Sequence, residues 1–396
     1  MTKNYPITDT WDLTKKKKKT KFYITTNTTN YMKLKKFEME EWFIRNENAK
    51  YNFSESGTPD FNLEEFLKTC NEDISRISKI SLGNNNTRGS LRLRKKISKL
   101  YNNIPEEEII TTTGTSEALY IFFRLFLKEG STVMTISPTF PILYLLPQSL
   151  NSEVHFIDAT KLKSKEELIV ETINQIKKKS PDLFILNLPN NPLGFSLNKS
   201  QIIRIIKTCK ETKTTILFDE HYRLLEDELP ESGYNITKEF YDKVFTVGSP
   251  IKCFGIVGSR LGWLIGNKKF ISEIREYKDY TTHCVSLLTE EIINIALENR
   301  KTLASKFLPT IKDNYDKLVK SNLVEIPYEW DSGCVTFLKL KKENSIEITK
   351  KLYEKFSISV MPGESFNKKG FIRINLSQPK EKFDYFLESL QNSIID

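Results

Sequence analysis

Short apolar runs alternate with longer segments of helical periodicity through the middle of the chain. Apolar runs that predict strands cover residues 108–112, 132–137, 183–187, 215–218, 244–247 and 260–265. Apolar positions at helical spacing predict helices over residues 116–127, 165–179 and 202–210. Strands that are apolar throughout must be covered on both faces, and helices between successive strands allow a parallel arrangement. The pattern therefore predicts an α/β fold with a mostly parallel central sheet and helices on both faces.

The pattern differs towards both ends of the chain. Residues 1–33 are polar, rich in Lys and Thr and without apolar periodicity, which predicts a flexible tail. Residues 81–288 hold the alternating elements and form the predicted large domain. Residues 289–396 begin with a long helical stretch and continue with an α+β pattern, which indicates a smaller C-terminal domain. We expect residues 34–80, which start with a short amphipathic helix, to contribute to that smaller domain.

Composition and charge argue against several classes of protein. A hydrophobic content of 39% is enough for a core, but no run approaches the roughly 18 apolar residues of a membrane span. The net charge of +9 includes the run Lys15 to Lys19, and no stripe of aromatic and basic residues accompanies it, so we expect no nucleic-acid partner. The five cysteines show no CxxC spacing and no pairing with His. They therefore predict neither a metal site nor a disulfide framework, and they fit the cytoplasm.

A glycine-punctuated loop after the apolar run at 244–247 carries Lys252. Ser249 lies three residues before this lysine and Arg260 eight residues after it. A lysine that forms a Schiff base must be partly desolvated, so that its amine can lose its proton near neutral pH. Ser249 and Arg260 are suited to hold a phosphate through charge-assisted hydrogen bonds. The alternative is an ordinary surface loop rich in Lys, Gly and Ser.

Two further motifs follow predicted strands. Gly114-Thr115-Ser116 stands where the strand at 108–112 meets a helix, and free N–H groups there would bind an anion unless the motif is a plain helix cap. Phe140 follows the strand at 132–137, at the sheet edge where open α/β folds bind ligands. It is expected either to stack on a planar ring or to belong to the core.

The next two strands also end in polar motifs. The segment Asn187 to Gly194 contains two prolines and a glycine, which fix a turn that can present the amides of Asn187 and Asn191. Asp219 ends the strand at 215–218, where a carboxylate is costly unless it is paired. Opposite a pyridinium nitrogen it would keep that nitrogen protonated and make the ring an electron sink. Tyr222 is placed to meet a ring phenolate, whereas His221 is expected to point to the other side.

Arg373 lies in an apolar strand near the C-terminus, within Phe371-Ile372-Arg373-Ile374. A buried guanidinium requires an anionic partner, and its planar fork suits a carboxylate. The partner is either a substrate carboxylate or an acid at the strand edge.

In this order the motifs resemble the class I/II aminotransferases, which are pyridoxal-phosphate enzymes of fold type I. The motifs are Gly114-Thr115-Ser116, Phe140, Asn187 to Gly194, Asp219-x-x-Tyr222, Ser249-x-x-Lys252 with Arg260, and Arg373. The resemblance runs from about Phe53 to the C-terminus. It implies a homodimer with the site near the interface, and amino acids and 2-oxo acids as the small molecules that it converts.

The resemblance also implies roles for individual residues. Lys252 would form the internal aldimine and move the proton at Cα towards a quinonoid and beyond, and Asp219 would hold the pyridine nitrogen. Asn191 and Tyr222 would meet the phenolic oxygen, with Phe140 stacked on the ring. The phosphate would be bound by Gly114, Thr115, Ser116, Ser249 and Arg260. The substrate would be bound by Gly57, Asn187 and Arg373.

Transamination is the first expectation for the reaction, with one alternative. Met39-Glu40-Glu41-Trp42 and Ser54-Glu55-Ser56-Gly57 are similar to the start of capreomycidine synthases, which act on a hydroxylated arginine with loss of water and ring closure. This likeness implies elimination with cyclisation or replacement on a substrate of that kind. Glu41 or Glu55, with Glu55 favoured, would then pair with its guanidinium or ammonium group.

Overall fold

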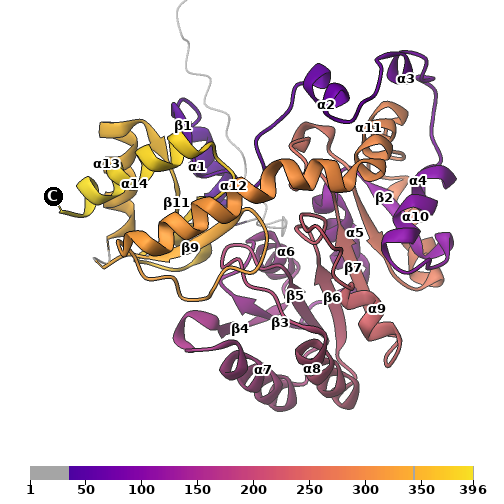
Figure 1. Ribbon diagram of the computed structural model, residues 1–396. Helices are drawn as coiled ribbons and strands as arrows, with labels where there is room; N and C mark the ends of the chain where they lie inside the picture. Colours follow the sequence, from indigo (N-terminus) through magenta and orange to yellow (C-terminus); the bar gives the residue numbers. More distant parts are fainter. Residues whose placement is uncertain (1–34, 342–343, 396) are drawn as a thin grey trace, which may run out of the picture. The chain divides into compact units, whose positions relative to one another are not determined.

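Seven strands form one sheet in the order β2-β8-β7-β6-β5-β3-β4 (Figure 1). They are β2 (Ile109–Thr112), β3 (Thr132–Ser137), β4 (Glu153–Asp158), β5 (Leu183–Asn187), β6 (Thr215–Asp219), β7 (Val244–Gly248) and β8 (Gly262–Ile265). Only β8 runs antiparallel to its neighbours, β2 and β7. This computed structural model describes residues 35–341 and 344–395, and it confirms the predicted α/β fold with a mostly parallel sheet. The predicted tail at 1–33 lies outside the described residues.

Helices cover both faces of this sheet. Successive strand residues point to opposite sides, so a strand that is apolar throughout presents an apolar surface on each face. Leu183 and Ile185 of β5 join one buried cluster and Phe184 and Leu186 the other. The first cluster includes residues of α5 (Gly114–Phe126), α6 (Ile142–Ser149) and α10 (Lys268–Lys278). The second includes residues of α4 (Leu91–Leu100), α7 (Lys165–Lys179), α8 (Lys199–Thr212) and α9 (Gly233–Lys238). The apolar strands are therefore covered on both faces, as the sequence pattern predicts.

A smaller, antiparallel sheet is built from the C-terminal part of the chain. Its strands lie in the order β11 (Met361–Pro362), β12 (Phe371–Asn375) and β9 (Val335–Lys339). The helices of this part are α11 (Leu287–Glu298), α12 (Arg300–Ser321), α13 (Ser345–Phe356) and α14 (Lys380–Ile395). The predicted long helical stretch is thus two helices, and Figure 1 shows α12 running from α11 towards the small sheet.

The N-terminal segment joins these C-terminal elements. After α1 (Glu38–Arg45), the short strand β1 (Tyr51–Asn52) pairs in parallel with β10 (Ile358–Ser359). The ring of Phe53 then stacks on that of Phe386 in α14, with centroids 4.8 Å apart. Two short helices, α2 (Leu63–Thr69) and α3 (Ser75–Ser78), lead on to α4. The domain boundaries expected at 80/81 and 288/289 stay a prediction, because the contacts join residues 34–396 in one unit.

Short 3-10 helices complete the described structure. They are η1 (Glu106–Glu108), η2 (Ala159–Lys161), η3 (Val257–Ser259) and η4 (Gly363–Phe366). Across residues 35–341 and 344–395, no helix combines the length and the apolar character that crossing a membrane requires.

Candidate active site

A cavity of about 380 Å³ lies where β5, β6 and β7 end, at the carboxyl edge of the large sheet. Its walls come from the N-terminal segment, the start of α5, and the segments that follow β3, β5, β6 and β7. The lining residues are Met39, Glu40, Phe43, Glu55, Ser56, Thr115, Ser116, Phe140, Asn187, Asn191, Asp219, His221, Tyr222, Ile251, Lys252, Val257 and Arg260. Parallel strands end at the same edge of a sheet, which explains why motifs far apart in sequence meet here.

Lys252 reaches the cavity from the loop after β7. Its side chain is 22% exposed, and its Nζ lies 4.0 Å from Oε2 of Glu55. Burial lowers the pKa of the Lys252 ammonium, and nearby Glu55 opposes that effect. A Cβ atom added at Gly57 would lie 3.3 Å from Cδ of Lys252, so Gly57 lets the loop before it approach the lysine closely. A lysine with a lowered pKa holds more neutral amine near pH 7, as a nucleophile or a base requires.

Asp219 is buried at the end of β6 and is 3% exposed. Its Oδ1 has no hydrogen-bond partner among the residues that the structure describes, and the nearest ionisable neighbour is Nδ1 of His221 at 3.5 Å. That distance is longer than an ordinary hydrogen bond. A buried carboxylate oxygen without a partner is costly, so this site suits a ligand that donates an N–H group to it.

The imidazole of His221 lines the same cavity, so the expectation that it points to the other side is wrong. Its Nδ1 lies 3.3 Å from Oγ1 of Thr115. Residues two apart in an extended segment share a side, and His221 follows Asp219 by two. Glu220, between them, is buried away from the cavity and makes an ion pair with Arg223 at 3.1 Å. Alternation along the strand is the signal that predicts this arrangement.

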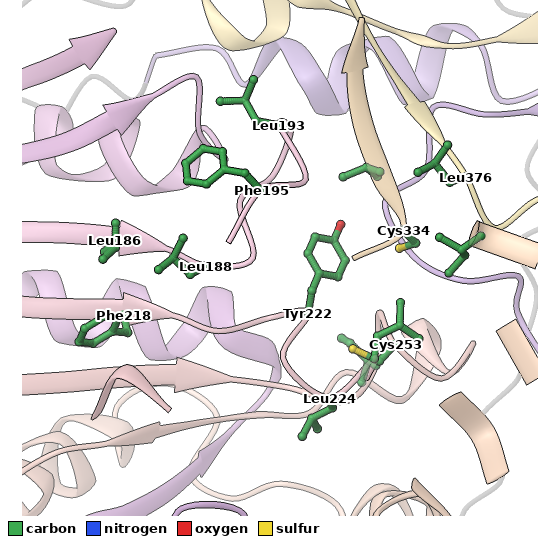
Figure 2. Packing of buried hydrophobic residues seen from close by; sticks show 14 of the residues in the cluster. Leu186, Leu188, Leu193, Phe195, Phe218, Tyr222, Leu224, Cys253, Cys334 and Leu376 are labelled. Carbon is green, nitrogen blue, oxygen red and sulfur yellow. The ribbon is translucent and has the colours of Figure 1, made fainter. Parts of the chain in front are cut away.

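Tyr222 turns its hydroxyl towards the N-terminal segment. Its Oη donates a hydrogen bond to the carbonyl oxygen of Ser56 at 2.6 Å. Sγ of Cys334 lies 3.2 Å from the same carbonyl oxygen. Figure 2 shows Tyr222, which follows β6, beside Cys334, which directly precedes β9. Burial raises the pKa of Tyr222 well above its usual range, so the phenol keeps its proton. Its predicted contact with a phenolic oxygen stays a prediction.

The first turn of α5 and the Arg260 guanidinium lie against each other. A Cβ atom added at Gly114, where φ is +74°, would lie 3.0 Å from Nη2 of Arg260. Thr115 and Ser116 line the cavity on this side. A helix N-terminus beside a guanidinium provides N–H donors and positive charge, which suits a phosphate. Ser249 is not among the lining residues, and its hydroxyl donates to the carbonyl oxygen of Leu261 at 2.6 Å.

Arg373 is fully buried in β12 and adjoins the cavity through Asn191. Its Nη1 donates to Oδ1 of Asn191 at 3.0 Å, and its Nη2 donates to the carbonyl oxygen of Ser54 at 2.5 Å. Asn187 fixes this arrangement, because its Oδ1 accepts the backbone N–H of Asn191 at 2.7 Å. The guanidinium also lies over the ring of Phe366, 5.2 Å from its centroid. The pair of Asn191 and Arg373 places fixed N–H donors next to the cavity.

Helix α1 adds three lining residues that were not among the predicted site residues, namely Met39, Glu40 and Phe43. The acid that faces the cavity from this helix is Glu40. Glu41 lies outside it and pairs with Lys36 at 3.0 Å and with Arg45 at 3.7 Å. Neighbours three and four apart on a helix share a face, so Met39 and Phe43 already indicate the inner face of α1.

Comparison with known proteins identifies the family to which this fold and site belong. The chain belongs to the aminotransferase class I and II family, whose description it matches over residues 50–390. It is 23% identical over 347 residues to an aspartate aminotransferase of Thermotoga maritima, covering 85% of this chain and 89% of that protein. The predicted family, fold class and enzyme class, a pyridoxal-phosphate-dependent aminotransferase, are confirmed.

Two further similarities bear on the reaction and the fold. The chain is 20% identical over 367 residues to a capreomycidine synthase of Streptomyces vinaceus, covering 90% of this chain and 93% of that protein. A solved pyridoxal-phosphate-dependent aminotransferase from Streptococcus suis superposes with a TM-score of 0.81 at 24% identity, covering 92% of this chain and 98% of that one. At that identity the solved structure supports the fold alone.

Proposed function

We propose that the protein transfers amino groups between an amino acid and a 2-oxo acid, with pyridoxal phosphate held in the cavity beside Lys252. The observation that carries the proposal is the buried Oδ1 of Asp219, which has no hydrogen-bond partner in the described part of the chain and lies in the same cavity as a lysine whose pKa is lowered by burial. We also propose that the protein is a homodimer and that it works in the cytoplasm.

The residues of the cavity fit each part of the cofactor. The first turn of α5 and Arg260 would bind the phosphate group. Asp219 would accept the N–H of the pyridine ring, and Phe140, which is half-buried and also lines the cavity, would lie against the ring. Bound pyridoxal phosphate supplies a carbonyl group that condenses with amines and a ring that takes up electrons from Cα.

The side chains of the chain would then carry out the proton transfers. Nζ of Lys252, whose pKa is lowered by burial, would take the proton from Cα of the substrate. Asp219 would keep the ring nitrogen protonated throughout, which favours that step. Arg373 would bind the substrate α-carboxylate beside Asn191, since its planar fork matches two carboxylate oxygens.

Transamination predicts a characteristic stoichiometry. In a single incubation without a 2-oxo acid, a suitable amino-acid donor should give at most one equivalent of its 2-oxo acid per site. Addition of 2-oxoglutarate should then restart turnover and release glutamate. Mass spectrometry of the quenched mixture measures both products across a panel of donors, basic ones included.

The second candidate is elimination with cyclisation or replacement, which the match to a capreomycidine synthase and the acids Glu40 and Glu55 favour. Such an enzyme turns over repeatedly without any 2-oxo acid, and its product has lost water or another leaving group. That result, with no 2-oxo acid from any donor, would replace transamination by the alternative.

Arg373→Lys should weaken substrate binding and slow the reaction together, because a lysine cannot make two parallel bonds to a carboxylate. We expect kcat/KM to fall by about tenfold or more, since a charged hydrogen bond contributes about 1.5–3 kcal/mol. Bound cofactor, measured after denaturation, should hardly change. If cofactor loss is the main effect, Arg373 has a structural role and the carboxylate site lies elsewhere.

A further inference from the structure

Two carboxylates in the cavity, those of Glu40 and Glu55, are left over once the proposed contacts of the cofactor and of the substrate α-carboxylate are assigned. The positive groups at the site are Lys252, Arg260 and, behind Asn191, Arg373. The proposed function engages all three, with the cofactor carbonyl, the phosphate and the α-carboxylate. The third acid, Asp219, is matched by the ring nitrogen. The imidazole of His221 lies next to Asp219 and Thr115, on the cofactor side.

Glu55 is held at a fixed place by the backbone that carries it. The amide of Asn375 donates to the carbonyl oxygens of Glu55 at 3.1 Å and of Gly57 at 2.7 Å. Tyr222 and Arg373 bind the carbonyl oxygens on either side of Glu55, those of Ser56 and Ser54. Its carboxylate is about half exposed, with Oε2 4.0 Å from Nζ of Lys252. When Lys252 binds the cofactor carbonyl, Glu55 loses the only cation with which it pairs in the described structure.

Glu40 adds a second carboxylate beside an apolar surface. It lies on α1 between Met39 and Phe43, and all three line the cavity. The carboxylate of Glu40 has no ion-pair or hydrogen-bond partner within residues 35–341 and 344–395. Both Glu40 and Glu55 act on the buried Arg373, where they oppose the lowering of its pKa by burial. Both acids line the same cavity, next to the place proposed for the substrate α-carboxylate.

We propose that Glu40 and Glu55 select substrates with a positively charged side chain, an ammonium or guanidinium on an aliphatic stem. The inference rests on the proposed function for the position of the substrate. The stem would pack on Met39 and Phe43, and the cation would reach the two carboxylates and form charge-assisted hydrogen bonds with them. Substrates with an acidic side chain would be repelled by the same pair.

The matched comparison is between a cationic donor and its neutral counterpart. For the wild-type enzyme we expect kcat/KM to favour lysine over norleucine, which has an aliphatic side chain of similar shape without the ammonium. Glu55→Gln and Glu40→Gln should each lower that ratio by about tenfold or more, since each removes a charged partner. Glu41→Gln is the control, because Glu41 lies on the same helix outside the cavity, and its ratio should not change.

A binding measurement separates this inference from the proposed reaction. 5-Guanidinopentanoate has a carboxylate and a cation but no α-amino group, so it binds without reacting. Hexanoate, which keeps the carboxylate and lacks the cation, is the matched comparison. Calorimetric titration of the holoenzyme should show tighter binding of the guanidino acid, with the difference reduced in Glu40→Gln and Glu55→Gln. Unchanged ratios in both variants, or a preference for glutamate as donor, would overturn the inference. Selective binding of the guanidino acid, with no turnover of any donor, would instead overturn the proposed amino-group transfer and leave the inference on Glu40 and Glu55 standing.

Discussion

Asp219→Ala should retain much of its cofactor and yet lose proton removal at Cα. The phosphate contacts proposed for α5 and Arg260 do not involve Asp219, so they remain. Without the carboxylate, the ring nitrogen loses its proton and stabilises the negative charge at Cα poorly. We expect a loss of several kcal/mol in the barrier, or at least about a hundredfold in rate. Exchange of the Cα proton of a donor for deuterium, followed by NMR, measures the step directly.

The control for this change keeps the shape of the side chain. Asp219→Asn replaces the carboxylate by an amide of nearly the same size, so the cavity is preserved. We expect a similar loss of exchange, because the charge is what the ring nitrogen requires. Cofactor content is measured in parallel for both variants. Near-normal exchange in either of them would refute the proposed role of Asp219.

Lys252→Ala should remove both the covalent link to the cofactor and the base at Cα. Borohydride reduction of the wild-type holoenzyme should attach the cofactor permanently to one lysine, and peptide mass spectrometry should place it at residue 252. In Lys252→Ala this adduct should be absent. The rate of Cα proton exchange should fall by about 10²–10⁴-fold, the range expected for a lost acid–base group.

Lys278 provides a matched control for that experiment. It is also buried with a pKa lowered by burial, but its Nζ donates to the carbonyl oxygen of Thr87 at 2.9 Å and it does not line the cavity. We therefore expect that burial and a lowered pKa alone do not make Lys278 reactive towards the cofactor. Lys278→Met should keep the reduced adduct at Lys252. An adduct on Lys278, or on any lysine other than Lys252, would contradict the assignment.

The large sheet was predictable because most of its strands are buried on both faces. Strands β5 and β6 read as continuous apolar runs, and their bounds differ from the prediction by a residue at most. Strand β4, which lies at one edge of the sheet and pairs only with β3, was not predicted. Glu153 and Phe156 are exposed there, so the strand lacks an apolar run. Burial on both faces is thus what makes a strand visible in the sequence.

The candidate site was predictable where motifs follow strands, since strand order brings those ends together. Contacts between distant side chains were not. Arg373 and Asn191 are 182 residues apart, and no local pattern indicates that the guanidinium donates to this amide. Similarly, the choice between Glu40 and Glu41 depends on which side of α1 faces the cavity. Helical periodicity could have settled that choice, because Glu40 and Phe43 are three residues apart.

The loop that carries Glu55 also sets an order of events during biosynthesis. Its carbonyl groups are bound by side chains of β12, and the contact between Gly57 and Asn375 spans 318 residues. A ribosome delivers the chain from its N-terminus, so residues 54–57 are synthesised before their partners in β12. A nascent chain that has reached residue 300 already contains α5, Asp219 and Lys252. It lacks Arg373 and Asn375, which bind the carbonyl oxygens of Ser54 and Gly57, so we expect the loop that carries Glu55 to be fixed in place only after β12 has been made.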